Sequence, residues 1–149
     1  MALSDIRGKI ATVLSGVTGI GTIHAYERWC NNWNEFLALY KTTAGIINGG
    51  CITRIKTPSL RDSGRTLRRD HTFLIRYMYG LKDSSATELT FQALVEAIQT
   101  AFDSQYTLGG NVLLAGPLQV IKIENRLFGT VLCHYAEMQI TAWERVSYS

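Results

Sequence analysis

Hydrophobic residues recur at helical spacing in three stretches of the chain. The first stretch follows Ser4, a residue type that caps helices, and should end at Gly16 because further glycines follow closely. The third begins with Ser85-Ala86-Thr87-Glu88, which matches a helix capping box, and its apolar side runs from Phe91 to Phe102. The second covers about 27–40 and places four aromatic residues on one side of a helix: Trp29, Trp33, Phe36 and Tyr40.

Strand-like patterns occupy two other regions. Residues 71–79 alternate regularly, and residues 51–57, limited by Pro58, can pair with them as a hairpin. Near the C-terminus, a strand over 118–124, a turn region at Asn125 and Arg126, and a long strand over about 128–143 form a second hairpin. The sequence therefore predicts an α+β fold of two layers. We expect a mixed or mainly antiparallel four-stranded sheet with about three helices packed on it.

Composition and length favour one globular unit. The chain has 149 residues, of which 46% are hydrophobic and 18% charged. We predict a single domain over 1–149, in which residues 58–70 form a basic extended connector or hairpin tip. We expect neither a secretory signal nor a membrane partner, because charged residues interrupt the first apolar positions and no apolar run approaches the roughly 20 residues of a membrane helix. The odd number and wide spacing of the cysteines predict reduced thiols in a cytosolic setting: Cys30, Cys51 and Cys133.

Positive charge is concentrated in one segment. The formal net charge of +3 is too small to predict nucleic-acid binding. Residues 54–69 alone carry a net charge of +5, with one acid, Asp62, against six basic residues: Arg54, Lys56, Arg61, Arg65, Arg68 and Arg69. Three interpretations are open: contacts to phosphates, a solvated tip, or an interface arm that pairs with acidic groups of a neighbouring subunit.

Motifs for catalysis, metals and cofactors are missing. The three histidines, His24, His71 and His134, have no metal-ligand spacing. Cys133 and His134 are adjacent, so on a regular strand they point to opposite faces and cannot form a dyad. We therefore expect no catalytic residue, no metal ligand and no cofactor. An enzyme would need one of the histidines to meet a carboxylate or a thiol in a pocket.

The aromatic stripe of the second helix has two interpretations. Its four residues, Trp29, Trp33, Phe36 and Tyr40, could stack nucleic-acid bases or form the core face of the helix. We favour the core, because a stripe at helical spacing is typical of a buried helix face.

One segment resembles a known group of proteins. Ile20-Gly21-Thr22-Ile23-His24-Ala25-Tyr26-Glu27-Arg28-Trp29 is a glycine-led short strand that runs into Tyr-Glu-Arg-Trp, and an aromatic helix follows up to Tyr40. A strand pair with an arginine-rich connector, one long helix from Ser85, and a hairpin ending near Trp143-Glu144-Arg145 come later. This order resembles the small tail terminator and neck proteins of long-tailed bacteriophages and prophages.

The resemblance implies a virion structural protein with no catalytic residues. Such a protein caps the tail tube as a ring, hexameric in the tail terminators, stops tail growth and offers the head-joining surface. Its partners would be further copies of itself, the tail tube protein and a head-connector or neck protein, with DNA passing through the lumen without sequence-specific contact. It would be assembled in the host cytoplasm and reside in the virion at the tail–neck junction. Interface candidates would be the 59–69 connector and the ends of the last hairpin.

Two other functions stay open at this point. The first is another neck component, such as a head–tail joining or tail completion protein, which would have similar size and no chemistry of its own. The second is a small nucleic-acid-binding module that uses the basic segment and the aromatic helix. It predicts binding that weakens steeply as salt rises.

Overall fold

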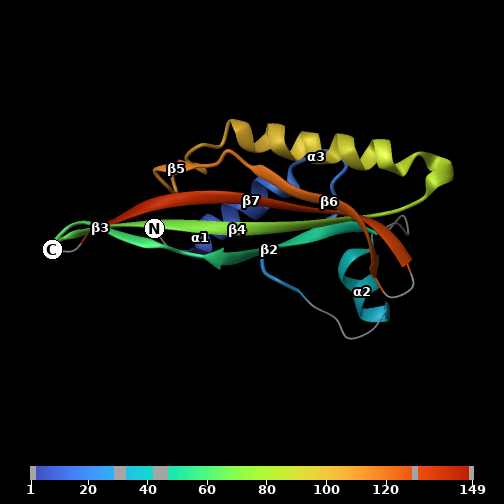
Figure 1. The fold of residues 1–149 in the computed structure, drawn as a ribbon, viewed down its shortest axis with the longest axis horizontal. Helices are drawn as coiled ribbons and strands as arrows, with labels where there is room; N and C mark the ends of the chain where they lie inside the picture. Colours follow the sequence, from blue (N-terminus) through green and yellow to red (C-terminus); the bar gives the residue numbers. More distant parts are fainter. Residues whose placement is uncertain (1–2, 29–32, 42–46, 129–130, 148–149) are drawn as a thin grey trace.

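A computed structural model describes residues 3–28, 33–41, 47–128 and 131–147 (Figure 1). The helices are α1 (Leu3–Ser15), α2 (Trp33–Tyr40) and α3 (Thr87–Asp103), with a short 3-10 turn η1 (Asp83–Ser85) before α3. The strands are β1 (Thr22–His24), β2 (Asn48–Lys56), β3 (Ser59–Ser63), β4 (Thr66–Gly80), β5 (Leu114–Ala115), β6 (Gln119–Phe128) and β7 (Val131–Ser147).

All of these strands belong to one mixed sheet. Its order is β1-β2-β4-β7-β5, with β3 also pairing with β4 and β6 also pairing with β7. β1 runs parallel to β2, and the other pairs are antiparallel. The prediction of an α+β fold with a mixed sheet is therefore confirmed.

The prediction of four strands is wrong, because the described residues form a sheet of seven. Pro58 separates β2 from β3, which follow one another along the same side of β4. Pro117 lies between β5 and β6, which share one side of β7 in the same way. Proline has no N–H to donate to a ladder, so each of these edges is divided into two strands. The third additional strand is β1, which lies in the glycine-led segment and was not counted in the predicted sheet.

The main core lies between one face of the sheet and the helices α1 and α3. Alternation along β4 directs Phe73, Ile75 and Tyr77 to this face, and all three side chains are fully buried. Phe91 of α3 stacks on Tyr77 with ring centroids 5.7 Å apart. α1 adds three buried residues at helical spacing: Ile6, Ile10 and Leu14.

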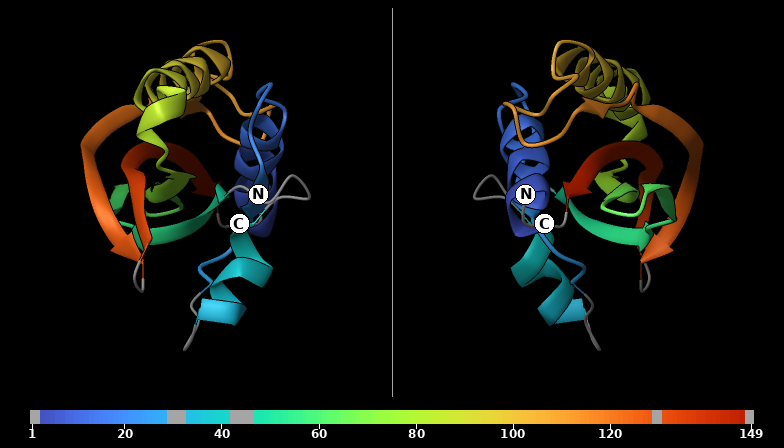
Figure 2. Two further views of the ribbon diagram at one scale, coloured as in Figure 1. Left: turned by 90° about the vertical axis from the view of Figure 1, so that its right-hand side faces the viewer. Right: turned by 90° about the vertical axis from the view of Figure 1, so that its left-hand side faces the viewer.

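The helix α2 lies against the opposite face of the sheet (Figure 2). Phe36 and Tyr40 are buried there in a second cluster with Met78, Cys133 and Tyr135. The two-layer prediction therefore fails at this end, where the sheet carries helices on both faces. The predicted core role of the aromatic stripe is confirmed for Phe36 and Tyr40, whereas Trp29 and the side chain of Trp33 lie outside the described residues.

Several predicted boundaries also shift. Glu27, the predicted start of the second helix, is not helical; its Oε1 accepts a hydrogen bond from Arg76 Nη1 at 2.7 Å, and the described part of α2 is Trp33–Tyr40. The capping box before α3 does not form, because the N-cap is Ala86 at φ 52° and no side chain caps the helix. Asn125 and Arg126, predicted in a turn, lie inside β6.

Candidate interaction surface: the basic arm

The structure brings all six predicted basic residues together on one projecting arm. We define the arm as residues 54–70 and 141–147, which comprise the end of β2, β3, the start of β4 and the end of β7. It extends from one end of the molecule past the described helices (Figure 1). Seven basic and three acidic residues lie in these ranges, which gives the arm a net charge of +4.

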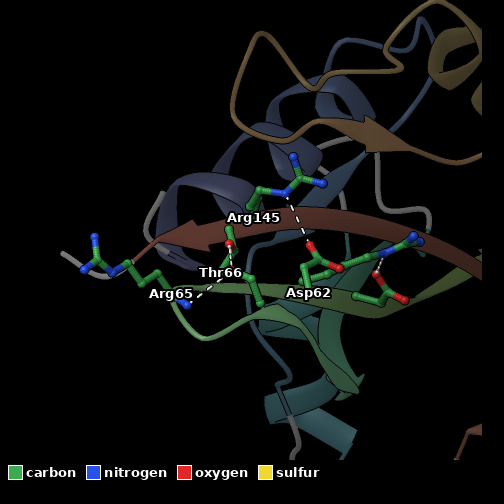
Figure 3. Close-up of polar contacts among 7 residues, drawn as sticks. Asp62, Arg65, Thr66 and Arg145 are labelled. Atoms are coloured by element: carbon green, nitrogen blue, oxygen red, sulfur yellow. Dashed lines mark hydrogen bonds and ion pairs between the residues drawn. The ribbon is translucent and has the colours of Figure 1, made fainter.

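The arm ends in a tight turn that exposes Arg65. Ser63 pairs with Thr66 in the β3–β4 register, so only Gly64 and Arg65 connect the two strands. The hydroxyls of Ser63 and Thr66 are 2.6 Å apart, and the Arg65 amide donates to Ser63 Oγ at 3.3 Å (Figure 3). Arg61 donates from Nη1 to the Gly64 carbonyl at 3.4 Å. These contacts brace the backbone of the turn, while the side chain of Arg65 remains exposed.

Two arginines connect three of the strands of the arm, β3, β4 and β7. Arg68 Nε lies 2.8 Å from Asp70 Oδ1, and its guanidinium sits 4.3 Å from the centroid of the Trp143 ring. Arg145 Nε at the end of β7 lies 3.4 Å from Asp62 Oδ2 on β3 (Figure 3). The Arg68–Trp143 contact joins β4 to β7, and the Arg145–Asp62 pair joins β7 to β3 across β4, so both cations stabilise the arm itself.

The other cations divide by exposure. Arg54, Lys56 and Arg65 are exposed, and within the described part of the chain their side chains make no ion pair or hydrogen bond. Arg69 is half-buried and stands opposite Glu144 in the β4–β7 register. Arg61 and Arg145 are exposed as well, but each is held by one of the contacts described above. Arg54, Lys56 and Arg65 are therefore the charges that the arm offers to another molecule.

A buried polar chain fixes the root of the arm. Thr57 Oγ1 lies 3.1 Å from His71 Nδ1, and His71 Nε2 lies 3.0 Å from Glu144 Oε1. The side chains of His71 and Glu144 are only 5% and 8% exposed. The Asp70 amide donates to the Pro58 carbonyl at 3.0 Å across the same junction. These contacts tie the segment between β2 and β3 to the central strands β4 and β7.

Sequence reasoning missed this contact of an imidazole with a carboxylate. His71 and Glu144 are 73 positions apart, and only the register of two long strands brings them together. The order hydroxyl, imidazole, carboxylate is that of a nucleophile, a base and an orienting acid. Here the imidazole is enclosed, with a partner on each nitrogen. The geometry is that of a brace between strands.

The other two histidines have different partners. His24 Nε2 lies 2.8 Å from the Leu39 carbonyl, and His134 Nε2 lies 3.0 Å from Thr87 Oγ1 at the start of α3. Burial lowers the pKa of His134, against a smaller raising effect of the Glu88 charge. Among the described residues, no three metal-ligating side chains come together.

Among the described residues, the short strands β1 and β5 pair on one side only, and so do the longer strands β3 and β6. β3 pairs with β4, and β6 pairs with β7. Apolar side chains are exposed on both strands: Leu60 on β3, and Ile121, Ile123 and Leu127 on β6. An open strand edge offers unpaired backbone donors and acceptors to another chain. The predicted connector is therefore an edge strand as well as the most basic part of the molecule.

In the described part of the chain, we find no helix with the length and continuous apolarity that crossing a bilayer requires. Comparison with known protein families and with curated proteins finds no match to this chain.

Proposed function

We propose that this chain is a bacteriophage structural protein that caps the tail tube as a ring, terminates tail growth and provides the head-joining surface. The role is structural, with no catalytic step, and its place is the tail–neck junction of the virion. The proposal starts from the resemblance of residues 20–40 and the later element order to tail terminator and neck proteins. The observation that carries it is the projecting arm, with its open β3 edge and three exposed cations that have no partner among the described residues.

The arm supports a ring for a geometric reason. A ring forms when one surface of a subunit meets a different surface of the next subunit and the rotation closes. The arm and the exposed side of α3 are two such surfaces, because they lie at different places on the molecule (Figure 1). A projecting hairpin can cross a subunit boundary, and arginine there can bind carboxylates of the neighbour.

The proposed partners follow from the resemblance to tail terminator and neck proteins. The ring would contact the tail tube protein on one side and a head-connector or neck protein on the other. Repeated around a ring, the cations of each arm would produce a strongly positive rim or lumen. DNA passing through such a lumen would be held by its phosphates, without reading of its sequence.

The test is electron microscopy of lysates from a phage or prophage that carries this gene and from the same genome with only this gene deleted. We expect overlong tubes of variable length without heads in the deletion, and normal tails when the wild-type gene is supplied from a plasmid. Tails of normal length beside unjoined heads would replace termination by a head-joining role. Intact infectious particles would refute a function in the neck.

A second part of the experiment tests the basic arm itself. The deletion is complemented with Arg54→Glu/Lys56→Glu/Arg65→Glu or with a matched control that reverses three exposed lysines outside the arm: Lys41→Glu, Lys82→Glu and Lys122→Glu. We expect the control to restore normal tails and the arm variant to fail. Equal restoration by both would show that the arm is only a solvated tip.

A further inference from the structure

We infer that the arm of one copy docks on the acidic side of α3 of a second copy, head to tail. The inference deepens the proposed ring-forming function and rests on it for its biological role. Its physical basis is the complementary charge, length and placement of two surfaces of the same chain.

The first surface is the arm, which presents cations that have no partner within the described residues. Lys56 pairs with Thr72 in the β2–β4 register, and Arg65 directly precedes Thr66. The β4 residue opposite Lys56 and the β4 residue next to Arg65 are therefore six positions apart along β4. At about 3.4 Å per residue, this spans roughly 20 Å.

The second surface is the exposed side of α3. The helix contains three acidic residues and no basic residue: Glu88, Glu96 and Asp103. All three are exposed, and within the described part of the chain their carboxylates make no ion pair or hydrogen bond. At about 100° per residue, they fall within an arc of roughly 80° and form one stripe. The buried residues of the helix, such as Phe91 and Ile98, lie on the other side.

The two surfaces match in length. Glu88 and Asp103 are 15 positions apart, which at about 1.5 Å per residue spans roughly 22 Å along α3. The cations on the arm span nearly the same distance. The arm of a second copy, laid along α3, could therefore form ion pairs at both ends of the helix.

The arm cannot reach the α3 of its own molecule. Figure 1 shows the arm extending from one end, while α3 lies over the rest of the sheet and away from the tip. The contact is therefore between molecules, and it joins unlike surfaces. Such a contact generates a ring if the rotation closes and an open chain of subunits if it does not.

The test is sedimentation velocity of the purified full-length protein at about 50 mM and 500 mM salt, with four proteins. These are the wild type, the arm variant Arg54→Glu/Lys56→Glu/Arg65→Glu, the helix variant Glu88→Lys/Glu96→Lys/Asp103→Lys, and the lysine control described above. All changed side chains are exposed, and circular dichroism with thermal unfolding verifies that each variant keeps the fold. We expect the wild type and the control to associate at low salt and dissociate at high salt.

The decisive sample is an equimolar mixture of the two variants. In each variant alone, the arm and the exposed side of α3 carry charges of the same sign. We therefore expect the self-association of each variant to be at least about tenfold weaker than that of the wild type. In the mixture, the acidic arm of the arm variant can bind the basic helix of the helix variant. The basic arm of the helix variant can bind the acidic helix of the arm variant, as in the wild type. Association should therefore return. Two variants that had both unfolded would not regain association when they are mixed.

Three outcomes would overturn the inference. One is a wild type that stays monomeric at low salt, and another is a mixture that stays as monomeric as its components. The third is an arm variant that self-associates normally but loses binding to a labelled DNA duplex, which would make nucleic acid the partner of the arm. Because the purified protein is measured without tails, failure here is distinguishable from failure of the tail-length experiment.

Discussion

Asn48 at the start of β2 holds the glycine-led segment before β1 in place. Its Oδ1 accepts hydrogen bonds from the Tyr77 hydroxyl at 2.7 Å and from the Gly21 amide at 3.1 Å. Its Nδ2 donates to the Gly19 carbonyl at 2.8 Å. Tyr77 is fully buried, and burial raises the pKa of its hydroxyl, which therefore remains a donor. One amide side chain thus links the α1–β1 connection, β2 and the core.

Asn48→Ala removes all three hydrogen bonds. At about 1 kcal/mol each, we expect the free energy of unfolding to fall by roughly 3 kcal/mol. Tyr77→Phe removes only one of them and should cost about 1 kcal/mol in the wild type. In the Asn48→Ala background the Tyr77 hydroxyl has already lost its acceptor, so its removal should cost nothing or restore some stability. The two changes are therefore coupled by about 1 kcal/mol or more.

Urea unfolding of the four proteins of this cycle, followed by circular dichroism, measures the coupling. Thr53→Ala on the same strand provides a control, because Thr53 has no side-chain hydrogen bond among the described residues. The reasoning is refuted if Tyr77→Phe costs the same with and without Asn48.

Three further predictions concern single positions. Burial lowers the pKa of His134 below its unfolded value, so protonation favours unfolding and the free energy of unfolding should fall as the pH drops below about 6.5. The fall should be smaller in His134→Gln, which urea titrations of both proteins at pH 7.5 and 5.5 measure. Gly50→Ala places a Cβ 2.1 Å from the Arg76 carbonyl oxygen and should cost roughly 3 kcal/mol or more, whereas Gly64→Ala meets nothing within 4 Å and should be close to neutral in thermal unfolding. Burial raises the pKa of Cys133 to about 11, so iodoacetamide at pH 8 should label it only after denaturation, as peptide mass spectrometry would detect.

Local patterns were sufficient where one element packs against one face. The end of α1 at Ser15, just before Gly16, and the apolar side of α3 follow directly from residue spacing. The predicted alternation over 71–79 likewise places Phe73, Ile75 and Tyr77 on one face of β4, and this face lies in the main core. In each case the period of the hydrophobic residues matches the period of the element.

Long-range arrangement was not available from those patterns. Nothing in the spacing of Phe36 and Tyr40 tells which face of the sheet α2 covers, because both faces of β4 carry apolar residues at that end. The Thr57–His71–Glu144 chain depends on the pairing of strands that are distant in sequence. For the candidate surface, the charge of the arm was visible in the sequence. Which cations stabilise the arm and which are left without a partner depends on how its strands pair, and this pairing could not be predicted from the sequence.

The central strands continue from the core into the arm without interruption. β4 and β7 pair over 15 residues, from Gly80 with Cys133 to Thr66 with Ser147, with no bulge between them. This ladder is about 50 Å long, and no hinge separates its buried part from its projecting part. Docking of the arm on the partner proposed above would therefore lose little conformational entropy, because the arm is already ordered. The same stiffness makes it a lever, through which a displacement at the tip is carried into the strands beneath α1 and α3.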